Sequence, residues 1–87
     1  MRIYEKKHLT ASGLVCTGAC TLRYLTLNKT DAATILINDD LTGLVTTIAT
    51  IQASAIPQTF RYDCIMSTGI YVTLNGSQDV TVIYEKP

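Results

Sequence analysis

Apolar and polar residues alternate along most of this chain with a period of two, not with the three- and four-residue steps of a helix. In the clearest run, Thr59 to Met66, four apolar side chains fall on one face and Arg61 and Asp63 on the other. Thr, Val, Ile and Tyr dominate these runs, and all four favour strands. The pattern therefore predicts an all-β chain without a helix of any length.

Turn-forming segments divide the chain into short runs at roughly 8–12-residue spacing, which is typical of a sandwich or small barrel. One of them, Asn75-Gly76, is a hairpin signal because Asn-Gly favours turns that need positive φ. The predicted strands cover residues 2–9, 13–16, 20–27, 33–38, 44–51, 59–66, 70–74 and 79–85. We expect a small eight-stranded β-sandwich, jelly-roll-like, with an immunoglobulin-like topology as the alternative. Residues 1–87 are short enough to form a single domain.

Two segments carry further expectations about the sheets. Leu44 to Ile51 is partly apolar on both faces, which favours a central strand covered on both sides. The tetrapeptide Ile3–Lys6 recurs as Ile83–Lys86. If these terminal strands pair antiparallel, Lys and Glu residues are expected opposite one another; chance similarity is the alternative.

The composition of the chain indicates what its surface is made of. Charged residues make up 16% of the chain, against roughly 25% in ordinary soluble domains. Part of the exterior must therefore be Thr, Ser, Asn or apolar, which suits packing against another protein; a Thr-rich monomer is the alternative. A chain this short has a thin core, and oligomerisation is one way to supplement it.

Charge and hydropathy also restrict the partners. The formal net charge is zero and no basic cluster stands out, so we expect no nucleic-acid partner. No apolar run reaches about 18 residues, so no membrane span is expected. Met1 to His8 lacks the apolar region of a signal peptide, and the protein is expected to be made in the cytoplasm.

The residues that commonly carry chemistry are few. Cys16, Cys20 and Cys64 are predicted to be free, small apolar side chains. A Cys16–Cys20 link, intermolecular pairing, or a zinc site with His8 are the alternatives. Nucleophilic catalysis needs a base, commonly His, but His8 is the only His and lies in a charged N-terminal strand, so it is interpreted as a surface residue. Asn38-Asp39-Asp40 is interpreted as a solvated turn, since it lacks the spaced ligands of a calcium loop. We expect no catalytic residue, metal site or cofactor.

Exposed aromatic and polar side chains are the remaining candidates for binding a partner. By alternation Tyr71 lies opposite the face shared by Ile70, Val72 and Leu74, so it is the tyrosine expected to point outward. An exposed Tyr stacks on sugars or fills a partner's pocket, although a Tyr that covers a sheet edge is the simpler reading. The candidate partner-binding residues are Tyr71, Asn75, Gln78 and Asp79.

Several short segments of predicted turns and strands resemble those of a known protein family. They are Gln58–Asp63, Ser67–Gly76, Asp79–Tyr84, Leu9–Gly13 and Asn28–Thr30. Together they resemble small β proteins of tailed phages and prophages, of the head-decoration or auxiliary capsid type. Cys16 and Cys20 lie outside that pattern.

The resemblance implies a non-enzymatic virion structural protein. As a capsid decoration protein it would bind an assembled shell as a homo-oligomer, with a trimer favoured. Its partner would be a major capsid or other virion protein, and its location the virion. The alternative is a carbohydrate- or receptor-binding module of a fibre or spike, using Tyr71 beside the loop from Asn75 to Asp79.

Overall fold

The computed structural model describes residues 4–29, 34–51 and 57–86, which form eight β-strands and no helix. The four strands of the first half are β1 (Tyr4–Leu9), β2 (Gly13–Thr17), β3 (Cys20–Lys29) and β4 (Ile35–Asn38). Those of the second half are β5 (Thr47–Ile51), β6 (Gln58–Met66), β7 (Gly69–Leu74) and β8 (Asp79–Glu85). The predicted all-β class and strand number are confirmed. Ala33, where the fourth strand was expected to begin, lies outside the described residues.

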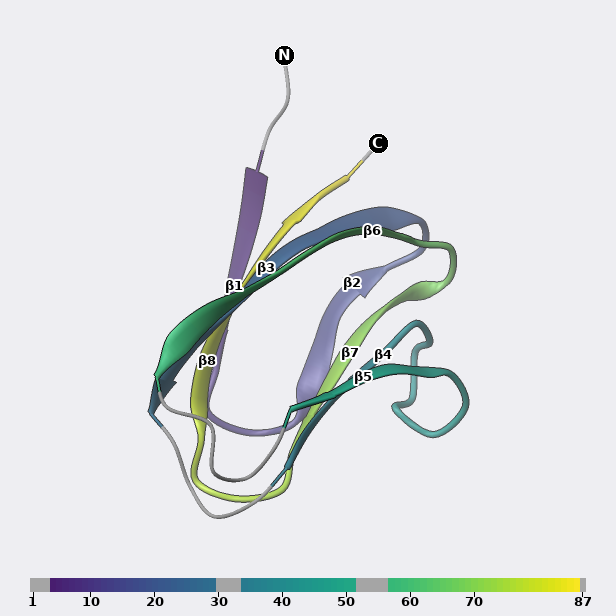
Figure 1. Cartoon of the computed structure of the whole chain (residues 1–87). Helices are drawn as coiled ribbons and strands as arrows, with labels where there is room; N and C mark the ends of the chain where they lie inside the picture. The colour runs from purple at the N-terminus through teal and green to yellow at the C-terminus, as the bar shows by residue number, and fades with distance from the viewer. Residues whose placement is uncertain (1–3, 30–33, 52–56, 87) are drawn as a thin grey trace.

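The strands form two four-stranded antiparallel sheets, β1-β8-β3-β6 and β2-β7-β4-β5 (Figure 1). The pairing is nested, because β1 pairs with β8, β2 with β7, β3 with β6 and β4 with β5. A long hairpin with this pairing rolls up when β3 also pairs with β8 and β4 with β7, as they do here. The result is the jelly roll that the sequence predicted, and the immunoglobulin-like alternative is excluded.

Inward-facing side chains of both sheets share one core. They include Leu22 and Leu25 of β3, Ile37 of β4 and Val72 of β7, all fully buried, with Val82 from β8. Burying one such side chain contributes about 1.5–3 kcal/mol. Alternation specifies the inward residues on β7 and β8 but not on β3. Leu22 and Leu25, which strict alternation would place on opposite faces, are both buried because the register of β3 with its neighbours shifts between Leu22 and Tyr24.

The predicted central strand from Leu44 to Ile51 is wrong in both extent and place. β5 begins only at Thr47 and lies at the edge of its sheet, paired with β4 alone. Residues 44–46 belong to the preceding loop, where the backbone N–H groups of Val45 and Thr46 bond to Asp40. Alternating Thr and apolar residues fit an exposed edge as well as a covered strand, so the pattern could not separate the two.

The terminal strands β1 and β8 do pair antiparallel, as the repeated tetrapeptide suggested. Their register places Glu5 opposite Tyr84 and Lys6 opposite Ile83, so the expected Lys–Glu opposition is wrong. In this register buried Leu9 lies opposite buried Val80. The register follows that core contact, because the buried face of a sheet fixes strand alignment.

Candidate interaction surface

The two sheets differ sharply in charge. No Asp, Glu, Lys, Arg or His occurs in β2, β4, β5 or β7, and we call their sheet the neutral sheet. The other we call the charged sheet. Its strands carry Glu5, Lys6, Lys7, His8, Arg23, Lys29, Arg61, Asp63, Asp79 and Glu85. Binding a partner removes water from the contact surface, and removing water from charged groups costs free energy. The neutral sheet is therefore better suited to such a contact than the charged sheet.

Charges on the outer face of the charged sheet are tied to one another. Arg23 donates from Nε to Glu85 Oε1 at 2.5 Å and from Nη1 to Asp63 Oδ1 at 2.9 Å. Arg61 also binds Asp63. The Arg61 and Arg23 guanidinium groups hold the pKa of Asp63 below its usual value. These ion pairs leave this face adapted to water.

Backbone geometry helps to build this network. Asp63 has φ of +51°, in the left-handed region that Asp tolerates better than most residues. Between the pairs Leu22–Cys64 and Tyr24–Arg61, Tyr62 and Asp63 of β6 lie opposite Arg23 alone, so the extra residue of this bulge is on β6. The two irregularities bring the Asp63 carboxylate and the Arg23 guanidinium together across the strands.

A second polar cluster involves the candidate Asp79. His8 Nε2 lies 2.6 Å from Asp79 Oδ1, and Asn28 Nδ2 donates to the same oxygen at 3.0 Å. The Asn28 and His8 contacts lower the pKa of Asp79. His8 is exposed, as the sequence predicted, and Asp79 is engaged within the chain rather than displayed to a partner.

On the neutral side, Asp40 organises the loop between β4 and β5. Its carboxylate accepts backbone N–H groups from Thr42, Gly43, Val45 and Thr46. It also accepts the amide of Asn38. These donors, Thr46 first, hold the pKa of Asp40 far below its usual range. Asp40 is only 6% exposed. The interpretation of Asn38-Asp39-Asp40 as a solvated turn is therefore wrong.

Asp39, unlike Asp40, binds outside its own loop, to the turn between β6 and β7. It accepts the backbone N–H groups of Ser67, Thr68 and Gly69 at 2.8–3.2 Å, and the Ser67 hydroxyl. Burial opposes ionisation of Asp39, but these donors outweigh it and lower the pKa. Two adjacent carboxylates thus fix the loop to its own backbone and to a neighbouring turn.

The loop lies against the outer face of the neutral sheet. Gly43 has φ of +77°, and a Cβ there would lie 2.6 Å from Tyr71 Cδ1 and 3.1 Å from Thr73 Oγ1. The loop therefore partly covers Tyr71, which faces away from the core but is only partly exposed. Tyr71 thus faces outward as expected, but the loop limits its exposure, and Tyr4 is the more exposed tyrosine at 57%.

Four exposed apolar side chains lie in this loop and the start of β5. We call Leu41, Leu44, Val45 and Ile48 the apolar patch; Leu44 is 87% and Val45 79% exposed. Sequence reasoning missed Leu44, Val45 and Ile48 by placing 44–51 inside a sheet. One signal was available, since residues 41–60 contain no charged residue and no His. Exposed apolar groups gathered in one segment mark interaction sites.

The four candidate partner-binding residues do not form one surface. Asn75 is exposed and bonds through Nδ2 to Thr34 Oγ1 at 3.1 Å, whereas Gln78 is buried. Tyr71 pairs with Asn38, at the other end of β4 from Thr34. Tyr71 and Asn75 are four residue steps apart along extended chain, about 13 Å. The structure therefore does not bring Tyr71 to the other three.

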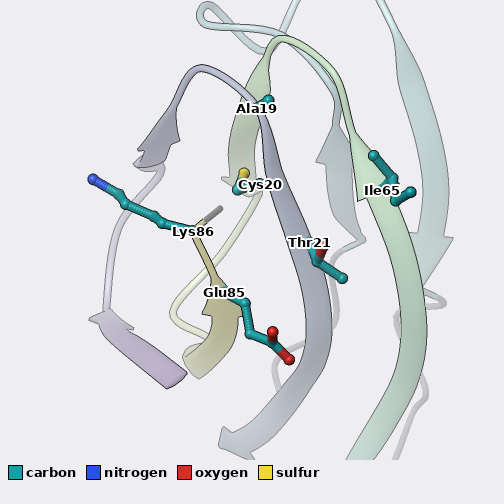
Figure 2. Close-up of a pocket in the computed structure, with 6 residues that line it drawn as sticks. All are labelled: Ala19, Cys20, Thr21, Ile65, Glu85 and Lys86. Carbon is teal, nitrogen blue, oxygen red and sulfur yellow. The ribbon is translucent and has the colours of Figure 1, made fainter. Parts of the chain in front are cut away.

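A shallow pocket of about 260 Å³ lies at the start of β3 and the ends of β6 and β8, lined by Ala19, Cys20, Thr21, Ile65, Glu85 and Lys86 (Figure 2). Burial, followed by a hydrogen bond with Cys16, raises the pKa of Cys20 to about 12. This thiol is therefore a poor nucleophile. Cys16, Cys20 and Cys64 are all free, as predicted. Lys86 extends away from the other lining side chains (Figure 2).

Within residues 4–29, 34–51 and 57–86, no group of three or more His, Cys, Asp or Glu side chains is placed to hold a metal ion. None of the described segments forms a helix long and apolar enough to span a bilayer. The strongest candidate site is therefore the apolar patch on its organised loop. Comparison with protein-family models, curated proteins and solved structures found no match to this chain.

Proposed function

We propose that this chain is a non-enzymatic structural protein of a tailed-phage virion. It docks on a shell of other protein subunits as a homo-oligomer, and the apolar patch is the contact surface. The observation that carries the proposal is the display of Leu44 and Val45, 87% and 79% exposed, on a loop fixed by two carboxylates. The resemblance to head-decoration proteins supplies the virion context.

Physical arguments favour a protein partner. Full burial of one Leu or Val is worth about 1.5–3 kcal/mol, which the chain alone leaves unused at these positions. The Asp40 hydrogen bonds already order the loop, so docking loses little further conformational entropy. A decoration protein that binds only the assembled shell stabilises that shell by mass action.

The test is incorporation into particles of the phage that encodes the chain. Particles assembled without the chain are mixed with purified protein, sedimented and analysed by quantitative mass spectrometry. Wild type is expected to sediment with them in a fixed ratio to the major shell protein. The double variant Leu44→Ser/Val45→Ser is expected to remain in the supernatant.

Ile65→Ser is the matched control, because Ile65 is an equally exposed apolar residue, at 82%, but lies on the charged sheet. It is expected to sediment like wild type. The proposal is overturned if wild type stays in solution, or if the double variant binds as well as wild type does.

The sugar-binding alternative has its own test. Specific hits on a glycan array that disappear in Tyr71→Ala would favour a carbohydrate-binding module. Tyr71 is partly covered by the loop at Gly43 and lies apart from Asn75. The residues proposed to bind sugar therefore do not form one exposed surface, whereas the apolar patch proposed to bind the shell lies in one segment.

A further inference from the structure

Cys16 and Cys20 lie at the corner where the chain passes from one sheet to the other. Cys16 belongs to β2 in the neutral sheet, Cys20 is the first residue of β3 in the charged sheet, and only residues 17–19 lie between them. Both side chains are 3% exposed and belong to the shared core. The two thiols therefore enter the same core from opposite sheets.

The two thiols are also in direct contact, because the Cys20 side chain is hydrogen-bonded to that of Cys16. Both lie near buried Tyr84, whose pKa is raised by burial first and then by the neighbouring Cys16, Glu5 and Cys20 side chains. A disulfide forms without strain only where the two sulfur atoms can meet without a large backbone movement. Contact between the thiols meets that requirement.

The backbone around the pair is held by the turn between β6 and β7. Gly18, midway between the two cysteines, has φ of +86°, and its N–H donates to the carbonyl of Thr68 at 2.8 Å. The strands of Cys16 and Cys20 pair with β7 and β6, on either side of that turn. Because the corner is already ordered, joining the thiols costs little further conformational entropy.

One of the two thiols is accessible to a small reagent. Cys20 is a lining residue of the shallow pocket of about 260 Å³ at the start of β3 (Figure 2). A pocket of this size has room for several water-sized molecules. An oxidant as small as hydrogen peroxide can therefore approach the Cys20 sulfur, with Cys16 behind it in the core.

We propose that Cys16 and Cys20 form a reversible disulfide when the chain meets a small peroxide, and that this bond joins the two sheets at their common corner. Disulfide pairs of this kind in chains made in a reducing cytosol are usually redox-sensing. The proposal goes beyond the shell-binding function and does not rest on it.

The reaction has two steps. The Cys20 thiolate attacks one peroxide oxygen and the O–O bond breaks, which leaves a sulfenic acid on Cys20 and a hydroxide that takes up the thiol proton as water. The Cys16 sulfur then attacks the Cys20 sulfur, the S–O bond breaks, and the Cys16 proton leaves with the hydroxide as a second water. The protein loses two electrons, and the peroxide gains them.

Peptide mapping of the full, folded chain tests the bond. Reduced protein is treated with hydrogen peroxide, its remaining thiols are alkylated after denaturation, and it is digested with trypsin. The tryptic peptide His8–Arg23 carries Cys16 and Cys20, whereas Cys64 lies in another. We expect His8–Arg23 to escape alkylation and to be lighter than its reduced form by two hydrogen atoms. Dithiothreitol should restore both thiols.

Thermal unfolding measures what the bond does to the fold. Oxidised wild type is expected to have a Tm about 5 °C or more above that of the reduced protein, because the bond restricts the unfolded chain. Cys64→Ala is the matched control, since it removes a half-buried thiol outside the pair, and it should show the same gain. Cys16→Ala should show none.

Two results would overturn the proposal. The first is a His8–Arg23 peptide that keeps two alkylated thiols after peroxide treatment, or that is joined to the peptide of Cys64. The second is a wild-type Tm that oxidation does not raise. Sedimentation with particles is measured separately, so failure of the disulfide and failure of the shell contact are distinguishable.

The pH dependence of the reaction tests which thiol attacks the peroxide. The thiolate is the reactive form, and the pKa of Cys20 is raised to about 12. Disulfide formation is therefore expected to be slow near neutral pH and to accelerate about tenfold for each pH unit below that pKa. A rate that levels off near the ordinary pKa of a thiol would overturn the assignment of Cys20 as the attacking group.

Discussion

The two sheets are alike on their inner faces and opposite on their outer ones. Both contribute fully buried aliphatic side chains to one core, such as Leu25 from β3 and Ile37 from β4. Outside, the charged sheet pairs Arg23 and Arg61 with carboxylates across its strands. The neutral sheet carries no charge in its strands and lies beside a loop that displays Leu44 and Val45.

This difference shows that the two outer faces of one jelly roll can have different surface chemistry while both sheets share a core. Acidic residues serve both sides, but in different ways. Asp63 forms ion pairs at the surface, whereas Asp40 is nearly buried and bonds to backbone N–H groups. The Asp63 carboxylate keeps the outer face of the charged sheet compatible with water. The Asp40 carboxylate instead orders a loop whose apolar side chains are exposed to solvent.

The largest expected effect tests the likeness of the inner faces. Leu25→Ala in the charged sheet and Ile37→Ala in the neutral sheet should each lower the free energy of unfolding by about 2–5 kcal/mol, because both leave a cavity in the shared core. Urea denaturation measures both. A loss confined to one variant would mean that the two sheets do not share a core.

Acid should weaken both the ion pairs of the charged sheet and the loop that Asp39 and Asp40 hold beside the neutral sheet. Asp39, Asp40, Asp63 and Asp79 all have pKa values lowered by folding. Their stabilisation is fully present above the ordinary value of 3.8 and is lost as the pH falls through the lowered values. Thermal unfolding followed from pH 7 to pH 2 should show a Tm that is steady above about pH 5 and declines below it. A Tm that rises on acidification would contradict these directions.

A single substitution should separate the two kinds of carboxylate. In Asp40→Asn, an amide NH₂ replaces an oxygen that accepts N–H donors from Asn38, Val45 and Thr46, so donors oppose donors. We expect Tm to fall by about 5 °C or more, with faster hydrogen exchange at residues 42–46. The matched control Asp63→Asn is more exposed and should cost less. An equal loss in both variants would remove the distinction between the sheets.

The sequence predicted the strands well because alternation reports directly which side chains face the core. It also indicated that part of the surface carries no charge. It failed at Leu44 to Ile51, where the same alternation fits either a covered strand or a loop followed by an exposed edge. The Asp39-Asp40 pair was likewise misread, because side-chain bonds to backbone several residues away leave no periodic signal.

Local order along the chain thus determined the class and the strand number, since these depend on each residue and its near neighbours. On β3 the register shift beside Arg23 decided which residues reach the core. Tertiary structure alone decided that β5 lies at an edge and that Asp40 is buried. It also decided that Tyr71 lies under the loop while Leu44 and Val45 do not. Those facts depend on which strands are brought together by the nested pairing, and such long-range contacts cannot be read from the local alternation of residues.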